Sequence, residues 1–195
     1  MTDYSLYALK EWSVTVDSLL AGQQILLLRK GGIHEQRDRF HLEHTEFFLF
    51  PTHVHQSEHA LFHSFQSRFD SLKGPKSSTV ILNTYAEVHQ FLPLASLDAL
   101  RALDGLHTLN WTTVEQRFFY RNRPGLNLLL LRIYRLPAPH QIRNIEPYDG
   151  CVSWVELETP LSLAGAEPVL DDHAFEEHVE RIRQCASPDR RSAQQ

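Results

Sequence analysis

Two short turns near the start of the chain carry residue types that could do chemistry, and each follows an apolar run. The first turn is Arg29-Lys30-Gly31-Gly32, which comes directly after residues 25–28. Glycines allow backbone N–H groups to turn toward an anion, and the arginine and the lysine add positive charge. The turn is therefore predicted to bind a phosphate group, with a solvated β-turn as the alternative. Its glycine spacing matches neither a Walker loop nor a dinucleotide-binding loop.

The second turn, residues 51–56, contains His53 and His55 together with Thr52 and Gln56. In an extended segment the two histidines point the same way, and such a pair can supply two ligands to a divalent metal. The spacing selects no particular metal, and nothing else in the sequence indicates a cofactor. The alternative is that these histidines are exposed or simply hydrogen-bonded. Thr52 and Gln56 are predicted to contact a ligand in the same turn.

His55 could also act as a general acid–base group, with Glu46 in the preceding apolar run to orient it. An imidazole titrates near neutral pH, and a neighbouring carboxylate can hold it in one orientation. His55 and Glu46 are therefore the candidate catalytic residues of a hydrolase. No nucleophile motif of the G-x-S-x-G type accompanies them in the sequence.

A third feature is a local excess of arginines in the second half of the chain, interleaved with aromatic residues. These arginines are Arg117, Arg121, Arg123, Arg132, Arg135 and Arg143. Arginine next to aromatic side chains can hold phosphates and stack on bases. Arg117 and Arg132 are predicted to bind a ligand, and Arg132 would emerge from a strand face that is otherwise apolar. The alternative is that the arginines pair with the acidic residues that the chain has in excess.

The elements that must position these residues are predicted from hydrophobic periodicity and from glycine and proline. Apolar residues at three- and four-residue steps predict a helix within residues 6–20, although alternation over residues 12–16 would suit a strand. Further predicted helices span residues 57–69, 96–103, 112–120 and 171–185, the third beginning with a capping box of Thr112 and Glu115. Predicted strands span residues 25–30, 40–50, 79–91, 126–135 and 151–158, with Pro51, Pro93, Pro137 and Pro139 as breakers.

Strands and helices follow one another without a regular βαβ rhythm, which favours the α+β class. We expect one domain over residues 1–186, with a mixed, mostly antiparallel sheet and flanking helices. A length of 195 residues suits a single domain. The polar segment 187–195 is predicted to be a disordered tail.

Composition argues against several classes of protein. The formal net charge of -5 means that any contact with nucleic acid must be a local patch. Two cysteines, Cys151 and Cys185, argue against a disulfide scaffold and against a four-cysteine zinc site. No apolar run approaches the roughly 18–20 residues that span a bilayer, and the start lacks the pattern of a secretory signal. A cytoplasmic protein without a membrane partner is predicted.

The sequence resembles the bacterial family called domain of unknown function 1802, over almost its whole length. The matching pieces are Ala8 to Trp12, Ile25 to Ile33, Glu43, Glu46-Phe47, Pro51-Thr52, His55-Gln56, Arg117-Phe118, Arg132 to Leu136, Cys151 and Ser153 to Leu157. The resemblance implies no assigned activity, although some relatives are associated with a restriction-endonuclease-like domain. It therefore hints at DNA restriction systems, but this chain has no clear carboxylate-x-lysine nuclease motif. His55 lies within the matching pieces and is the preferred site histidine.

The leading hypothesis is a cytoplasmic binding or accessory protein for a phosphate-bearing ligand such as nucleic acid or a nucleotide. One alternative is a hydrolase that uses His55 and Glu46, with or without a divalent metal. Another is a structural subunit that contacts a protein partner and has no small-molecule site. The first two hypotheses require the turn that contains Lys30 and the turn that contains His55 to meet in space.

Overall fold

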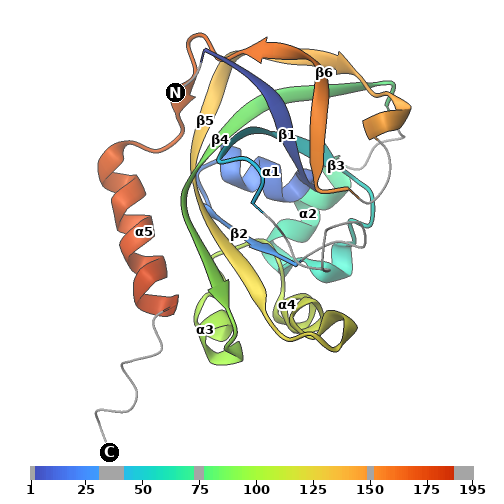
Figure 1. Ribbon diagram of the computed structural model, residues 1–195. Coiled ribbons are helices and arrows are strands. Elements are labelled where there is room, and N and C mark those ends of the chain that lie inside the picture. Colours follow the sequence, from blue (N-terminus) through green and yellow to red (C-terminus); the bar gives the residue numbers. More distant parts are fainter. Residues whose placement is uncertain (1–2, 31–41, 73–76, 149–151, 187–195) are drawn as a thin grey trace, which may run out of the picture.

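The protein folds around a curled sheet in a computed structural model that describes residues 3–30, 42–72, 77–148 and 152–186 (Figure 1). Within these residues the sheet has seven strands: β1 (Tyr4–Trp12), β2 (Leu26–Arg29), β3 (Glu46–Thr52), β4 (Thr79–Leu94), β5 (Leu126–Arg143), β6 (Trp154–Ser162) and β7 (Glu167–Pro168). The strand order is β2-β5-β4-β3-β1-β6, and β7 pairs with β5. Among the described strands only β1 and β3 run parallel. The predicted mixed, mostly antiparallel sheet is confirmed.

Five α-helices and three short 3-10 turns accompany the sheet in the described part of the chain. They are α1 (Ser13–Leu20), α2 (His63–Leu72), α3 (Leu97–Ala102), α4 (Trp111–Phe118), α5 (Asp172–Ala186), η2 (Glu58–Ala60), η3 (Tyr120–Asn122) and η4 (Glu146–Tyr148). Figure 1 shows α1 inside the curl of the sheet, α3 and α4 at one end of the paired strands β4 and β5, and α5 along the outside. The α+β class is therefore confirmed. The predicted tail at residues 187–195 lies outside the described residues.

The first predicted helix is wrong over its first half, because residues 4–12 form β1 and only Ser13–Leu20 is helical. β1 lies between β3 and β6, so its apolar residues on both faces are buried and the sequence shows no clean alternation. The predicted capping box at Thr112 and Glu115 is also wrong. Instead Asn110 caps α4 by accepting a hydrogen bond from the Thr113 N–H at 3.0 Å.

The prolines do not end their strands as predicted. Pro51 and Pro93 lie inside β3 and β4, and Pro137 and Pro139 lie inside β5. The β4–β5 ladder shifts register between Leu82 and Thr84, whose partners are His140 and Arg135, so Pro137 and Pro139 fall in an irregular stretch. Proline has no N–H to donate and is tolerated at such bulges. The other boundaries shift as well: the strand predicted at 40–50 is β3 at Glu46–Thr52, and the one predicted at 151–158 is β6 at Trp154–Ser162.

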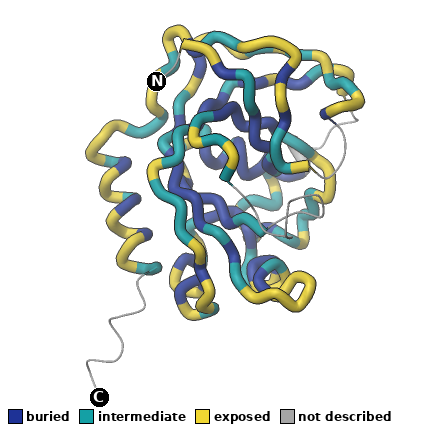
Figure 2. The backbone as a smooth tube through the Cα atoms, viewed as in Figure 1, coloured by how far each residue is buried: buried dark blue, intermediate teal, exposed yellow. Residues whose placement is uncertain are grey.

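The interior of the curl is filled by α1 and the strands around it. Val16 and Leu19 of α1 pack with Leu27, Phe47 and Leu129 in one buried cluster. Figure 2 shows this continuous buried zone at the centre of the molecule. Each such fully buried side chain contributes about 1.5–3 kcal/mol, so the ends of β1, β2 and β3 are held in fixed positions. No helix among the described residues is long and apolar enough to cross a membrane.

Candidate functional site

Arg29 closes the curled sheet. It is the last residue of β2, at one end of the strand order, while β1 and β6 lie at the other end. Its guanidinium donates to the Lys10 carbonyl at 3.1 Å, to Glu11 Oε2 at 2.9 Å and to Ser153 Oγ at 2.9 Å. Glu11 is only 6% exposed, and its other carboxylate oxygen accepts from the Trp12 N–H. The ends of β1 and β2 are therefore fixed to one another by a buried ion pair.

A pocket of about 180 Å³ opens beside this ion pair, and we call it the Arg29–Arg117 pocket. Its lining residues are Lys10, Glu11, Trp12, Arg29, Thr52, Val54, His55, Arg117, Val152 and Ser153. Four of the residues predicted to bind a ligand or to act on one meet here: Arg29, Thr52, His55 and Arg117. The two turns singled out in the sequence thus converge, together with a residue of α4.

Arg117 adds a second guanidinium to the pocket wall. It lies 4.7 Å from the centre of the Trp12 ring. Burial lowers the pKa of Arg117 below its ordinary value; Glu11 raises it and Arg29 lowers it further. Within the described residues no hydrogen bond or ion pair reaches this guanidinium, because the neighbouring Glu11 carboxylate is held by Arg29. Among the described lining residues, two guanidiniums therefore share one carboxylate, so this wall carries more positive than negative charge.

His55 reaches the pocket through an unusual backbone conformation. Its φ is 57°, in the left-handed region that non-glycine residues seldom adopt. The preceding Thr52 hydroxyl accepts a hydrogen bond from the Val54 N–H at 3.1 Å, which helps to shape the turn. Such a conformation costs about 1–3 kcal/mol and tends to occur at functional sites.

His53 and Gln56, which were predicted to bind metal and ligand respectively, hold this turn against the start of α1 instead. The Gln56 side-chain oxygen accepts from the Ser13 hydroxyl at 3.0 Å and from the Val14 N–H at 3.3 Å. The Ser13 oxygen also lies 3.2 Å from His53 Nδ1. Trp12 provides no side-chain cap for α1, so the Gln56 side chain, from a distant segment, accepts the hydrogen bond of a free N–H at the start of the helix.

The structure does not arrange His53 and His55 as the predicted metal-binding pair. The left-handed residue at 55 turns its side chain toward the pocket, whereas the His53 ring lies at Ser13. No group of three or more metal-ligating side chains is found among the described residues. The extended segment assumed from the sequence is replaced by a turn, so alternate residues do not share one face.

Glu46 cannot orient His55, so the predicted catalytic pair is not formed. Glu46 begins β3 and Thr52 ends it, and six strand steps of roughly 3.3 Å place them about 20 Å apart. The Glu46 carboxylate accepts a hydrogen bond from the Tyr85 hydroxyl at 3.0 Å. It belongs to the opposite end of the sheet from the pocket.

Lys30 does not line the pocket, but it holds the segment that follows Arg117. Its ammonium group donates to the carbonyls of Phe118 at 2.9 Å and Gly125 at 2.8 Å, and also to that of Arg123. One lysine thus gathers three carbonyls of the turn between α4 and β5. Gly31 and Gly32, the predicted phosphate-binding glycines, lie outside the described residues.

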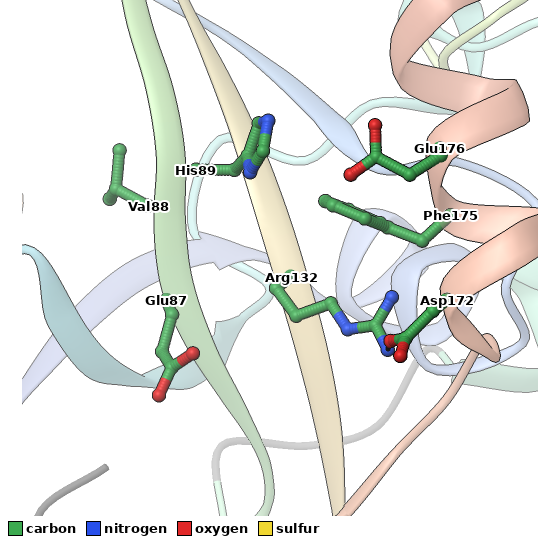
Figure 3. Close-up of a pocket in the computed structure, with 7 residues that line it drawn as sticks. All are labelled: Glu87, Val88, His89, Arg132, Asp172, Phe175 and Glu176. Carbon is green, nitrogen blue, oxygen red and sulfur yellow. Dashed lines mark hydrogen bonds and ion pairs between the residues drawn. The ribbon is translucent and has the colours of Figure 1, made fainter.

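Arg132 lies in a different cavity, which has a volume of about 410 Å³ and which we call the Arg132 cavity (Figure 3). Its lining residues are Glu87, Val88, His89, Arg132, Asp172, Phe175 and Glu176. Arg132 is paired with Asp172 at 2.6 Å and lies 4.6 Å from the centre of the Phe175 ring. Three carboxylates and one guanidinium line this cavity, so two of the arginines predicted to form one cluster, Arg117 and Arg132, lie in places of opposite charge.

Comparison with known proteins identifies the family. The model of the family described as domain of unknown function (DUF1802) matches residues 8–181. The chain belongs to the DUF1802 family. The fold is also similar to that of ASCH from Zymomonas mobilis, with 11% identity, a TM-score of 0.44, and coverage of 91% of this chain and 93% of that one. A serine-to-alanine mutant of the same protein gives 11% identity, a TM-score of 0.43, and coverage of 92% and 98%. A comparison with curated proteins gave no match.

Some residues that build the site of this DUF1802 domain carry no local signal in the sequence. Lys10 and Glu11 come from β1, in a segment predicted to be helical, and a strand was needed to bring Glu11 to Arg29. His107 lies behind the pocket at a cavity of about 10 Å³ that Glu11 and Arg117 also line. It is 4% exposed, and burial lowers its pKa to about 4, with Arg117 adding to the effect. Nothing in the local sequence distinguishes this buried histidine from the exposed ones.

Proposed function

We propose that this DUF1802 domain binds a phosphate-bearing ligand, namely nucleic acid, in the Arg29–Arg117 pocket. The observation that carries the proposal is Arg117, a guanidinium that its surroundings desolvate and that no carboxylate neutralises within the described residues. Arg117 is half-buried, and a partly desolvated charge that makes no ion pair of its own is unfavourable. An anion in the pocket would supply the missing negative charge.

The charge and the shape of the pocket both suit a phosphate group. Among the described lining residues, Lys10, Arg29 and Arg117 contribute three positive charges against one negative charge from Glu11, a balance of about +2 in which His55 is not counted. A volume of 180 Å³ corresponds to about six water molecules at roughly 30 Å³ each. This is room for a phosphate and part of its sugar, but not for a large enclosed ligand.

The pocket is also open at its rim, which suits a polymer better than a small molecule. Val54 and Val152 line it and are 54% and 36% exposed. A chain of nucleotides could therefore enter one phosphate and continue across the surface on both sides. Because the whole protein carries a net charge of -5, attraction of a polyanion must come from this local excess of positive charge.

Fluorescence anisotropy with labelled RNA and DNA oligonucleotides, at several salt concentrations, tests the proposal. We expect affinity to fall as salt rises, because bound cations are released when phosphates are neutralised. Arg117→Gln should weaken binding by roughly tenfold or more, since hydrogen bonds to charged groups contribute about 1.5–3 kcal/mol.

Arg181→Gln is the matched control, because Arg181 is an exposed arginine on α5 and its replacement changes the net charge equally. Thermal unfolding of both variants checks that the fold is intact. Absence of binding by the parent protein, or an equal loss in the two variants, would contradict the proposal. Competition between DNA and RNA of the same sequence then tests the link to restriction systems, which predicts a preference for DNA.

A further inference from the structure

Some exposed apolar side chains line the Arg29–Arg117 pocket, and others follow one of its residues closely along the chain. Among the described residues, six large apolar side chains are exposed, and two of these, Val54 and Val152, line the pocket itself. Two more, Phe119 and Tyr120, are 49% and 44% exposed and follow Arg117 by two and three residues. Adjacent exposed aromatic residues are unfavourable in water unless something covers them.

Hydrogen bonds from Lys30 fix the backbone of the segment that carries Phe119 and Tyr120. Lys30 binds the carbonyls of Phe118, Arg123 and Gly125, on both sides of the two aromatic residues. The Phe118 ring is only 3% exposed and packs edge-on against Phe119, with 4.9 Å between ring centres. The exposed rings of Phe119 and Tyr120 are therefore carried by a segment whose backbone is fixed.

The backbone after these rings is strained. Arg121 and Asn122 both have left-handed conformations, with φ of 58° and 54°. Asparagine adopts this conformation more readily than most residues, but for Arg121 it costs about 1–3 kcal/mol, and strain of this kind concentrates at functional sites. The turn places the Arg121 guanidinium 5.5 Å from the centre of the Tyr120 ring, so a cation and two aromatic rings share this surface.

We propose that Phe119 and Tyr120 form a base-stacking surface beside the pocket, so that the domain selects single-stranded over double-stranded nucleic acid. Aromatic rings combined with arginines are the means by which proteins hold successive bases of a single strand. This inference rests on the proposed function, because the pocket supplies the phosphate contact and the aromatic surface supplies the base contact.

The two contacts are close along the chain. Phe119 follows Arg117 by two residues at the end of α4, so their Cα atoms are at most about 7.6 Å apart at 3.8 Å per residue. Side chains two residues apart on a helix face different sides, so a strand that uses both contacts passes over the C-terminal end of α4. The bases of a duplex are already paired and stacked within it, so their faces are not available to the two rings.

The test compares three probes of equal length: a single strand, its duplex, and an abasic single strand that keeps the phosphates but lacks the bases. For the parent protein we expect tighter binding of the single strand than of either other probe. The double variant Phe119→Ala/Tyr120→Ala should lose roughly tenfold or more in affinity for the single strand. Its affinity for the abasic strand, and the slope of affinity against salt, should match those of the parent because no cation is lost.

Tyr4→Ala is the matched control, since Tyr4 is a 60% exposed aromatic residue at the opposite end of β1 from the pocket. It should leave all three affinities unchanged. If the parent binds the duplex as tightly as the single strand, or the double variant binds the single strand as the parent does, the stacking surface is refuted while salt-dependent binding stands. If the parent binds none of the probes, the proposed function itself fails.

Discussion

The Arg29–Arg117 pocket and the Arg132 cavity are built from similar parts but have opposite electrostatic character. In each, an arginine lies over an aromatic ring, Arg117 over Trp12 and Arg132 over Phe175. The pocket has two guanidiniums and one carboxylate, whereas the cavity has one guanidinium and three carboxylates. Arginine beside aromatic residues is therefore not enough to mark an anion site, because the acidic residues brought in by neighbouring strands and helices decide the sign.

Burial is the main cause of the titration shifts in both regions. In the pocket, burial lowers the pKa of Arg117, while Glu11 raises it and Arg29 lowers it. Next to the cavity, burial raises the pKa of Tyr134 to about 12; the hydrogen bond from its hydroxyl to Glu87 at 2.7 Å also raises it, and Arg132 lowers it. In each region a group that is removed from water favours its uncharged form.

The largest effect is expected from Glu11→Gln, which removes the carboxylate that the described residues place between Arg29 and Arg117. This change breaks the buried ion pair with Arg29 and takes a negative charge away from Arg117. Breaking a buried ion pair in this way destabilises a protein by about 3–5 kcal/mol. Denaturation by urea measures the loss of unfolding free energy.

Repeating the denaturation with sulfate in the buffer tests whether the lost stability comes from the excess of positive charge in the pocket. Sulfate should restore part of the stability of Glu11→Gln, because an anion can take the place of the lost carboxylate. The control is Glu176→Gln, which removes an exposed carboxylate from the Arg132 cavity and should change stability by less than about 0.5 kcal/mol. An equal response of both variants to sulfate would mean that the pocket holds no special affinity for anions.

The next largest effect concerns acid stability and His107, which lies behind the pocket. Its pKa is lowered to about 4 in the folded protein, from an ordinary value of 6.5. The unfolded chain therefore binds more protons between these values, and stability falls as pH drops from about 6.5 to about 4. A difference of about 2.5 pKa units corresponds to roughly 3 kcal/mol.

Unfolding free energies measured from pH 7 to pH 4 test this expectation. In His107→Phe, an uncharged ring replaces the imidazole, so this part of the pH dependence should disappear. The exposed His173 on α5 provides the control, and His173→Phe should leave the slope unchanged. A parent slope equal to that of His107→Phe would show that the buried imidazole does not titrate in this range.

The sequence predicted correctly those helices and strands that are marked by nearby residues, such as an apolar run, a helical spacing or a capping serine. The strand around Leu26–Arg29 is an apolar run before glycines, and the helix Asp172–Ala186 shows its buried face as Phe175, Val179 and Ile182 at helical spacing. Ser96, where a helix was predicted to begin, caps α3 by accepting a hydrogen bond from the Ala99 N–H. β1 was missed because burial on both faces hides the two-residue period of a strand.

The site could be predicted only in part, because some of its residues are marked by local patterns and others are brought in by the fold. Arg29, Thr52 and His55 follow apolar runs, where chemistry-bearing turns are expected, and they do meet in one pocket. The partnership of Glu11 with Arg29 joins residues 18 apart through strand order, which no local pattern encodes. The capping of α1 by Gln56 spans 42 residues and likewise depends on the fold. Residue type and local spacing thus indicate candidates, while tertiary pairing decides which of them face a ligand.

The smallest effect is expected from Arg132→Gln, and it tests whether the two regions are separate. Arg132 is paired with Asp172, whose side chain is 99% exposed, so this ion pair contributes at most about 1 kcal/mol to stability. Affinity for nucleic acid should stay at the parent value, in contrast to Arg117→Gln, because the charge of Arg132 is already neutralised. Anisotropy and urea denaturation on the two variants side by side give both quantities. A loss of affinity as large as that of Arg117→Gln would show that the ligand reaches across to the Arg132 cavity. The surplus charge at Arg117 would then be only one part of a longer binding surface.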